Sequence, residues 1–113
     1  MHEVALTEAV VRIVLEHARA AGAERIVAIR LEIGQFSHVE PDAMRFCFDA
    51  VTAGTPVAGA RLEIARVPGR AWCHDCAAEV AIPHLGAECP VCGGGRLRVS
   101  EGDDLRVKEM EVA

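Results

Sequence analysis

The apolar residues of this chain change along its length from helical to alternating spacing. Over residues 5–21 they recur every three or four positions, which predicts an amphipathic helix that ends at Gly22. Its predicted buried stripe consists of Leu6, Val10, Ile13, Val14 and Ala21. Residues 26–33 alternate instead, which predicts a strand with one buried face. The residues on that face are Ile29, Leu31 and Ile33.

The same two periodicities predict the rest of the main domain. Pro41 suits the first turn of a second helix, which ends by Gly54. The predicted buried stripe of this helix consists of Met44, Cys47, Phe48 and Val51. Alternating residues predict further strands over residues 61–67 and 104–112. This order of elements predicts an α+β fold of about three strands and two helices.

A small module of different composition interrupts this fold. From about Pro68 to Arg96, cysteine, glycine and proline become frequent, and only residues 79–82 suggest a short strand. The module contains two Cys-x-x-Cys turns, which are formed by Cys73 with Cys76 and by Cys89 with Cys92. Two such turns supply the four sulfurs of a closed tetrahedral Zn²⁺ site. We therefore predict a zinc-ribbon or rubredoxin-like module with a structural zinc, although the second turn also resembles the iron-binding loop of rubredoxins.

Charge and apolar content exclude several classes of function. The chain has 17 acidic and 12 basic residues and a net charge of −5, so it lacks the basic footprint of a nucleic-acid-binding protein. We expect no nucleic-acid partner. No apolar stretch is long enough to cross a membrane, and the first residues lack the features of a signal peptide. We therefore expect a cytoplasmic protein with no membrane partner, in which paired cysteines bind metal.

The opening sequence Met1-His2-Glu3 is a second candidate metal site. The Met1 amine, the amide nitrogens of His2 and Glu3, and the His2 ring can lie in one plane around an ion. Ni²⁺ and Cu²⁺ accept such square-planar nitrogen ligation, whereas Zn²⁺ does not favour it. The residues alone leave open the alternative that His2 is an exposed side chain in a frayed chain end.

Three histidines and one acid are weaker candidates. His38 and Glu40 can add a metal ligand if their loop lies near the first residues of the chain. Glu40 has an alternative role as an acid at the positive end of the second helix. His74 lies inside the first Cys-x-x-Cys turn, where it either hydrogen-bonds to a thiolate or is an exposed loop residue. We expect His84 on the surface of the same module.

The remaining candidates favour structural roles. His17 lies at the edge of the predicted stripe of the first helix and is expected to be a partly buried packing residue. Cys47 is expected to be an inert thiol in the core. The sequence contains no glycine-rich phosphate loop and no Ser/His/Asp set of familiar spacing. No catalytic site is predicted.

Several motifs occur in an order typical of one family. They are Met1-His2-Glu3, the segment from Ile33 to Ser37 followed by Val39-Glu40, the segment from Phe46 to Asp49, and the two cysteine pairs. With these motifs the chain resembles the HypA/HybF family, the nickel metallochaperones of hydrogenase maturation. The resemblance implies an α/β nickel-binding domain of residues 1–67 with 98–113, and a zinc-binding module of residues 68–97.

The resemblance also assigns roles to residues. It implies that His2 is the key Ni²⁺ ligand, together with the Met1 amine and neighbouring backbone nitrogens. It implies that the Glu3 side chain supports this site, and that Glu40 occupies the position of an acid that can assist nickel binding. The four cysteines would hold the zinc.

The resemblance further implies a protein that transfers nickel and is not an enzyme. The expected metals are a structural Zn²⁺ and a transient Ni²⁺. The expected partners are a maturation GTPase and the large subunit of a hydrogenase. Whether the protein also supplies nickel to urease is left open. The alternatives are a zinc-ribbon adaptor that binds a protein partner without a nickel site, and a rubredoxin-like electron carrier.

Overall fold

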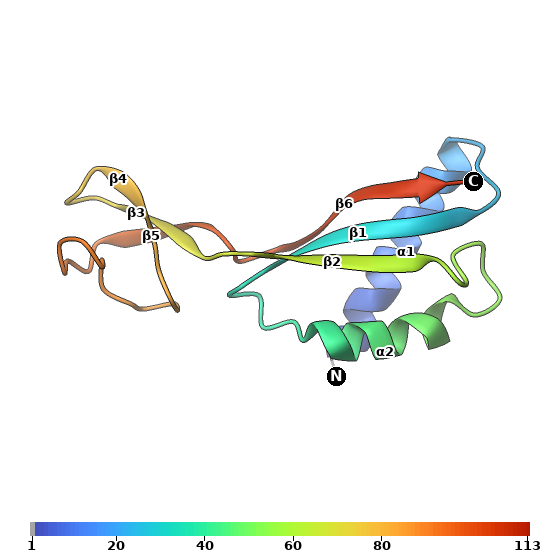
Figure 1. Ribbon diagram of the computed structural model, residues 1–113, viewed down its shortest axis with the longest axis horizontal. Helices are drawn as coiled ribbons and strands as arrows, with labels where there is room; N and C mark the ends of the chain where they lie inside the picture. The colour runs from blue at the N-terminus through green and yellow to red at the C-terminus, as the bar shows by residue number, and fades with distance from the viewer. Residues whose placement is uncertain (1) are drawn as a thin grey trace. The chain divides into compact units, whose positions relative to one another are not determined.

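The computed structural model describes residues 2–113, and over this range the chain forms two helices and two three-stranded sheets (Figure 1). The helices are α1 (His2–Ala20) and α2 (Pro41–Thr52). The strands are β1 (Ile26–Gly34), β2 (Arg61–Val67), β3 (Arg70–Cys73), β4 (Ala78–Ala81), β5 (Leu97–Glu101) and β6 (Leu105–Val112). The predicted α+β fold is confirmed. Neither helix in this range combines the length and the apolar character that a membrane crossing requires.

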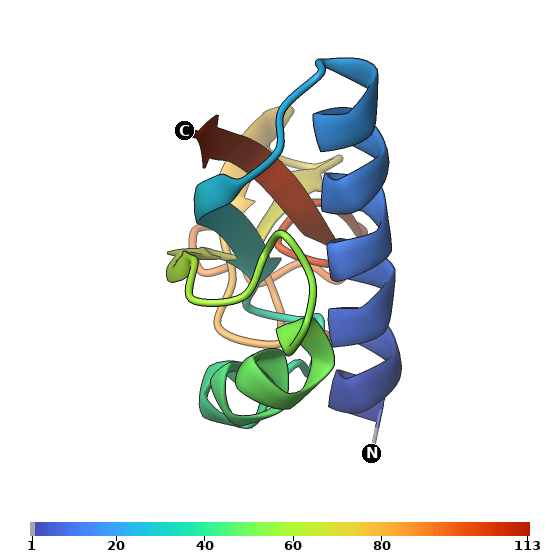
Figure 2. The same ribbon diagram turned by 90° about the vertical axis from the view of Figure 1, so that its right-hand side faces the viewer.

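Both helices lie on the same side of the sheet β2-β1-β6 (Figure 2). In the central strand β1, Ile29 and Leu31 are buried, as predicted, whereas Arg30 between them is exposed. Met44 and Phe48 of α2 are buried as well. The alternation along β1 therefore separates a face covered by helices from an open face.

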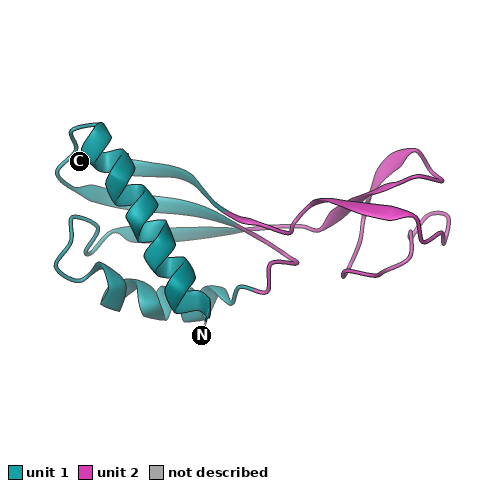
Figure 3. Ribbon diagram, turned by 180° about the vertical axis from the view of Figure 1, so that it is seen from behind, with its two compact units in different colours: residues 1–32, 39–65, 106–113 teal, residues 33–38, 66–105 magenta. Residues whose placement is uncertain are grey.

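The chain divides into two compact units, which Figure 3 shows in teal and magenta. The first unit contains residues 2–32, 39–65 and 106–113, and the second contains residues 33–38 and 66–105. The predicted module, residues 68–97, falls inside the second unit, which also takes in the segment just before α2. The assignment of the two units as nickel-binding and zinc-binding domains stays a prediction.

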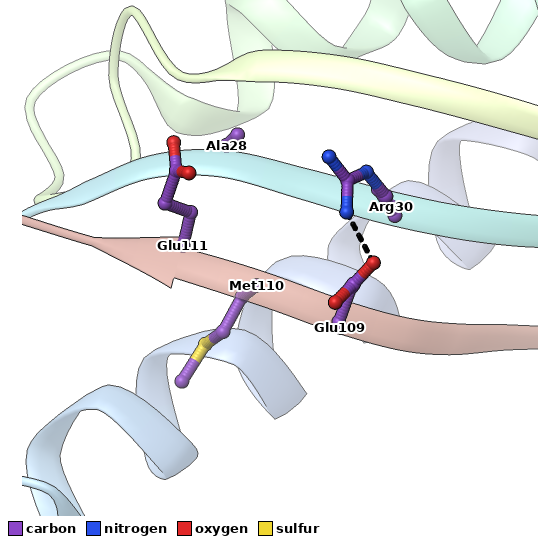
Figure 4. Close-up of a pocket in the computed structure, with 5 residues that line it drawn as sticks. All are labelled: Ala28, Arg30, Glu109, Met110 and Glu111. Atoms are coloured by element: carbon purple, nitrogen blue, oxygen red, sulfur yellow. Dashed lines mark hydrogen bonds and ion pairs between the residues drawn. The ribbon is translucent and has the colours of Figure 1, made fainter.

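Charged residues occupy the open face of the sheet β2-β1-β6 (Figure 4). The Arg30 guanidinium binds Glu63 of β2 at 3.2 Å and also binds Glu109 of β6. Hydrogen bonds from Arg61 and Arg30 lower the pKa of the Glu63 carboxyl. Because these side chains are solvated, each pair contributes little alone, but together they connect all three strands.

The buried stripe of helix α1 agrees with the predicted one only at Val10 and Val14. Its buried residues are Thr7, Val10, Val11, Val14 and Ala18. The prediction was wrong at Ile13 and Ala21, which are exposed. The stripe is rotated toward Thr7, whose hydroxyl donates to the Glu3 carbonyl at 2.6 Å. This bond allows the threonine to be buried without an unpaired polar group.

Helix α2 begins where the sequence predicts. Pro41 is at its start, and Glu40 is the N-cap, with its carboxylate accepting a hydrogen bond from the Asp42 N–H at 3.3 Å. Of the predicted stripe, the buried members are Met44 and Phe48, and the half-buried members are Cys47 and Val51. Cys47 therefore lies at the edge of the core, which corrects the prediction of a core thiol.

Strand β3 is the centre of the second sheet and pairs antiparallel with β4 and β5. The register places Cys73 opposite Ala78 on one side and Leu97 on the other. Strand β4 corresponds to the predicted strand over residues 79–82. Strands β3 and β5 were not predicted, because short strands in a segment rich in cysteine and glycine show little periodicity.

The segment before α2 supplies part of the core of the second unit. Phe36 is buried there in a cluster with Ala71, Cys73, Val80, Ile82 and Cys89. Its ring occupies the space that a Cβ atom at position 69 would need, so Gly69 lies directly against it. At Gly34 a Cβ atom would overlap the backbone carbonyl of Gly102. Glycines therefore permit the close backbone packing of this unit.

Candidate metal centres

The four predicted zinc ligands come together in the second unit. Cys73 ends β3 and Cys76 follows in the turn to β4, while Cys89 and Cys92 come from the loop before β5. The sulfurs of Cys73 and Cys92 are 3.7 Å apart, and those of Cys76 and Cys89 are 3.8 Å apart. All four lie within 4.8 Å of one another. A tetrahedron with Zn–S bonds of about 2.3 Å has edges of about 3.8 Å, so this spacing fits Zn²⁺.

Backbone amides surround the cysteine sulfurs. The N–H groups of Cys76, Val91 and Gly94 each donate to a cysteine sulfur at 3.4 Å. Each cysteine pair is followed by a residue in the left-handed conformation, which is Ala77 (φ 51°) in the first turn and Gly93 (φ 73°) in the second. Since N–H donors stabilise negative charge on sulfur, both turns favour thiolates, the form that binds metal.

The thiols of this centre differ in their pKa values. Hydrogen bonds from the backbone N–H groups of Cys92 and Val91 lower the pKa of Cys89 to about 7. Hydrogen bonding with the Cys92 sulfur raises the pKa of Cys76 to about 12. Near neutral pH the sulfurs therefore share protons, which an incoming cation must displace. Cys73 and Cys89 are buried and Cys92 is exposed. Because four thiolates leave no open position on a tetrahedral ion, the site is of the structural kind.

The residues beside the cysteines make other contacts. His74 is exposed, and Asp75 binds the Arg96 guanidinium, which lowers the pKa of the Asp75 carboxyl. His84 is exposed as predicted, with its Nδ1 3.0 Å from the Leu85 carbonyl oxygen. The centre is therefore formed by cysteines alone.

The amino-terminal candidate lies in the first turn of α1. This helix begins at His2, whose side chain is 53% exposed, and Met1 lies outside the described residues. The Nε2 atom of His2 is 3.5 Å from the Oε2 atom of Glu3. The first amides of an α-helix have no acceptor within the helix. The amide groups of His2 and Glu3 are therefore not needed for helical hydrogen bonds.

Glu3 connects this turn to the start of α2. Its Oε2 atom accepts a hydrogen bond from the Glu40 backbone N–H at 3.3 Å, and this bond lowers the pKa of the Glu3 carboxyl. The Glu40 carboxylate is itself occupied as the cap of α2. The structure thus brings His2, Glu3 and Glu40 into one region of the first unit.

Within residues 2–113, the four cysteines are the only group of three or more His, Cys, Asp or Glu side chains close enough to share an ion. His38 is exposed and belongs to no such group. His17 is exposed too, so the prediction of a partly buried packing residue was wrong, because α1 turns this position to solvent. The described residues therefore contain no second ready-made cluster of metal-binding side chains.

Comparison with known proteins connects this geometry with a family. A family model described as "Hydrogenase/urease nickel incorporation, metallochaperone, hypA" matches residues 1–112. This chain belongs to the HypA family. A hydrogenase maturation factor HypA from Azotobacter chroococcum mcd 1 is 52% identical over 112 residues, which cover 99% of both chains. A HypA protein from Rhodopseudomonas palustris strain TIE-1 is 50% identical over the same length and coverage.

Solved structures of HypA proteins share the fold. The solution structure of the nickel metallochaperone HypA from Helicobacter pylori superposes with a TM-score of 0.72 at 20% identity, covering 97% of this chain and 96% of that one. A second HypA solution structure gives a TM-score of 0.77 at 22% identity, covering 100% and 97%. At these identities the structures bear on the fold alone.

As a member of the HypA family, the chain is a nickel metallochaperone of hydrogenase maturation and not an enzyme. The resemblance drawn from the sequence motifs is confirmed. Membership favours a nickel carrier over the zinc-ribbon adaptor and the electron carrier.

Proposed function

We propose that this HypA-family protein carries Ni²⁺ at its first three residues for delivery to a hydrogenase. The ligands are the Met1 amine, the His2 ring, and the amide nitrogens of His2 and Glu3. The observation that supports this choice is the position of His2 and Glu3 at the start of α1. An amide proton displaced there breaks no helical hydrogen bond, and planar nitrogen ligation suits Ni²⁺.

In this proposal Glu3 positions the site. Its carboxylate contacts the His2 ring at 3.5 Å and the Glu40 N–H at 3.3 Å. When the His2 ring turns toward an ion, the bond to Glu40 still holds the first turn of α1 against α2. The Glu40 carboxylate is solvent-exposed, and it can leave its capping position to assist the ion.

We assign a structural Zn²⁺ to the four cysteines, on the strength of the sulfur spacing and the burial of Cys73 and Cys89. Bound there, Zn²⁺ cross-links the two turns, with a binding free energy of roughly 10–16 kcal/mol that contributes to the folding of the unit. Iron fits a similar spacing. The loaded protein should be colourless, because Zn²⁺ has a filled d shell.

Transfer of nickel follows from the location of the proposed ligands. At a chain end, a partner can replace the ligands one at a time. We propose a maturation GTPase as the partner in delivery and the large subunit of a hydrogenase as the destination. Protons compete for the amine, the ring and the amides, so nickel binding weakens as the pH falls. Free thiols favour the reducing cytoplasm as the compartment.

A nickel titration of the untagged, zinc-loaded protein tests the nickel site. We expect stoichiometric binding in the wild-type protein and none in His2→Ala, with the zinc content unchanged. His17→Ala is the matched control, because His17 is an exposed histidine of the same helix. Unchanged nickel affinity in His2→Ala would overturn the proposed ligand set.

A second titration separates backbone ligands from side-chain ligands. Acetylation of the Met1 amine removes one nitrogen donor and leaves every side chain in place. We expect the nickel affinity to fall. Normal affinity in the acetylated protein would point instead to side chains such as His38 and Glu40.

A further inference from the structure

An apolar groove lies beside the amino-terminal turn in the first unit. It separates the start of α1 from the outer side of α2 and has a volume of about 420 Å³. It is lined by Val4 of α1 and by Ala43, Phe46, Cys47, Ala50 and Val51 of α2. Glu3 of α1 also lines it. The lining is therefore apolar except for one acid.

Phe46 differs from the other two phenylalanines of the chain. It is 85% exposed, whereas Phe36 and Phe48 are buried. A phenyl ring in water has a large apolar area, and covering it with apolar surface is favourable. Cys47 and Val51 beside it are only half-buried. The exposed ring and the groove together form a surface that an apolar side chain of a partner can cover.

The groove continues along α1. A second hollow of about 440 Å³ is also lined by Val51 of α2, and by Thr55 just beyond that helix. On α1 it is lined by Glu8, Val11, Arg12, Leu15, Glu16 and Arg19. From Val4 to Arg19, α1 rises roughly 22 Å at 1.5 Å per residue. That length accommodates a partner helix of about four turns.

The rim beside the exposed ring is acidic. Asp42 and Asp49 lie about one helical turn before and after Phe46, and both are exposed. Glu3 adds a carboxylate from α1. The basic residue of this part of α2, Arg45, donates to the Leu62 carbonyl at 2.5 Å and is therefore held toward β2. At the Phe46 end the rim thus favours a partner with basic residues beside its apolar ones, whereas along α1 Glu8 and Glu16 alternate with Arg12 and Arg19.

We propose that the groove between α1 and α2 is a docking site for a basic amphipathic helix of a partner protein. An apolar side chain of the partner covers Phe46 and enters between Val4 and Cys47, while its lysines or arginines face Asp42 and Asp49. Docking does not need the proposed nickel ligands, so the two proposals can fail separately. Because Glu3 borders the groove, the docked helix lies beside the turn that carries His2.

Synthetic peptides titrated into the zinc-loaded full chain test this surface. One peptide of about four helical turns carries leucines at positions i, i+4, i+7 and i+11, with lysines on both sides of this stripe. In the second peptide every lysine is replaced by glutamate. We expect the lysine peptide to bind, to shift the NMR signals of Phe46 and Val51, and to weaken as salt increases. Failure of the lysine peptide to bind, or equal binding of both peptides, would overturn the proposal.

A pair of variants locates the binding. We expect Phe46→Ala to lower the affinity for the lysine peptide by about tenfold or more, as for an aromatic anchor of an interface. Val91→Ala should change nothing, because it removes an apolar side chain, 76% exposed, from the second unit. Nickel titration of Phe46→Ala should match the wild-type protein. Equal peptide affinity in Phe46→Ala overturns the proposal, as does self-association of the chain that Phe46→Ala abolishes.

Discussion

The cysteine centre and the proposed nickel site are constructed in opposite ways. The cysteine centre takes all its ligands from side chains, holds them at tetrahedral spacing, and surrounds them with amide donors. The proposed nickel site relies on backbone nitrogens at the start of a helix and on one ring that is 53% exposed. Preformed, enclosed ligands retain an ion, whereas ligands at an open chain end can be exchanged. Retention and release therefore depend on where the donors lie in the chain.

The largest effect should come from breaking the closed centre. Cys73→Ser replaces a buried ligand, so we expect loss of zinc and unfolding of the second unit, which depends on roughly 10–16 kcal/mol of metal binding. Nickel stoichiometry should persist, because His2 and Glu3 belong to the first unit. Metal analysis and NMR signals from both units measure the two outcomes. Loss of nickel together with zinc would contradict the independence of the centres.

The second effect concerns packing instead of ligation. Phe36→Ala removes a ring from the core of the second unit and should destabilise that unit by about 3–5 kcal/mol in denaturant unfolding. Phe46→Ala is the matched control, because it removes the same ring from an exposed position. The control should change the unfolding free energy very little. Equal effects of the two variants would contradict the burial of Phe36.

The third effect is the pH dependence of zinc binding at the cysteine centre. Zinc binding must displace protons from thiols such as Cys76, whose pKa is about 12, and Cys89, whose pKa is about 7. We expect the apparent zinc affinity to fall as the pH falls, by about tenfold per pH unit for each proton displaced. Calorimetry in buffers of different ionisation enthalpy measures the protons released. Zinc affinity independent of pH between 6 and 8 would contradict the proton sharing.

The hydrogen bond between the Glu3 carboxylate and the Glu40 N–H should respond to pH in another range. The pKa of the Glu3 carboxyl is lowered from the ordinary value of 4.5, chiefly by the hydrogen bond from the Glu40 N–H. A carboxyl with a lowered pKa stabilises the fold above its ordinary value and loses this effect as the pH falls through the lowered one. Between pH 8 and 5, where nickel is lost, this hydrogen bond should therefore remain. The NMR chemical shift of the Glu40 amide measures it.

The smallest effect tests the symmetry of the two turns. Ala77 follows the first cysteine pair in a left-handed conformation, and Gly93 has the same conformation after the second pair. Because this conformation costs a residue with a side chain about 1–2 kcal/mol, Ala77→Gly should stabilise the zinc-loaded protein by about 1 kcal/mol. Gly93→Ala should have the opposite sign in the same unfolding measurement. A destabilised Ala77→Gly protein would show that the backbone at this position carries no strain.

The cysteine centre could be predicted from the sequence because its ligands are paired within short turns. Strand β2 could also be predicted, from its alternating residues, and so could the start of α2, from Pro41. The proposed nickel ligands were different, since backbone nitrogens leave no pattern beyond a histidine at position 2. Donor chemistry made Met1-His2-Glu3 a candidate site, and the resemblance to a family was needed to choose it over a frayed chain end.

The failures of prediction have physical causes. The stripe of α1 was misplaced because Thr7 satisfies its own hydroxyl and can be buried. The role of Phe36 was missed because its partners, such as Val80, are distant in the sequence. The predicted stripe of α2 correctly included Phe48 and left out Phe46. The groove itself was not predicted, because it forms between two helices that are distant in the sequence.

The glycines of the second unit constrain how related sequences can diverge. A side chain at Gly34 or Gly102 would meet backbone atoms of another segment, and no mutation elsewhere can make those atoms smaller. A side chain at Gly69 would meet the ring of Phe36, which a smaller residue could replace. A larger residue at position 69 can therefore be tolerated when position 36 changes to a smaller residue. No second substitution can make room at positions 34 and 102, so both should remain glycine in related sequences.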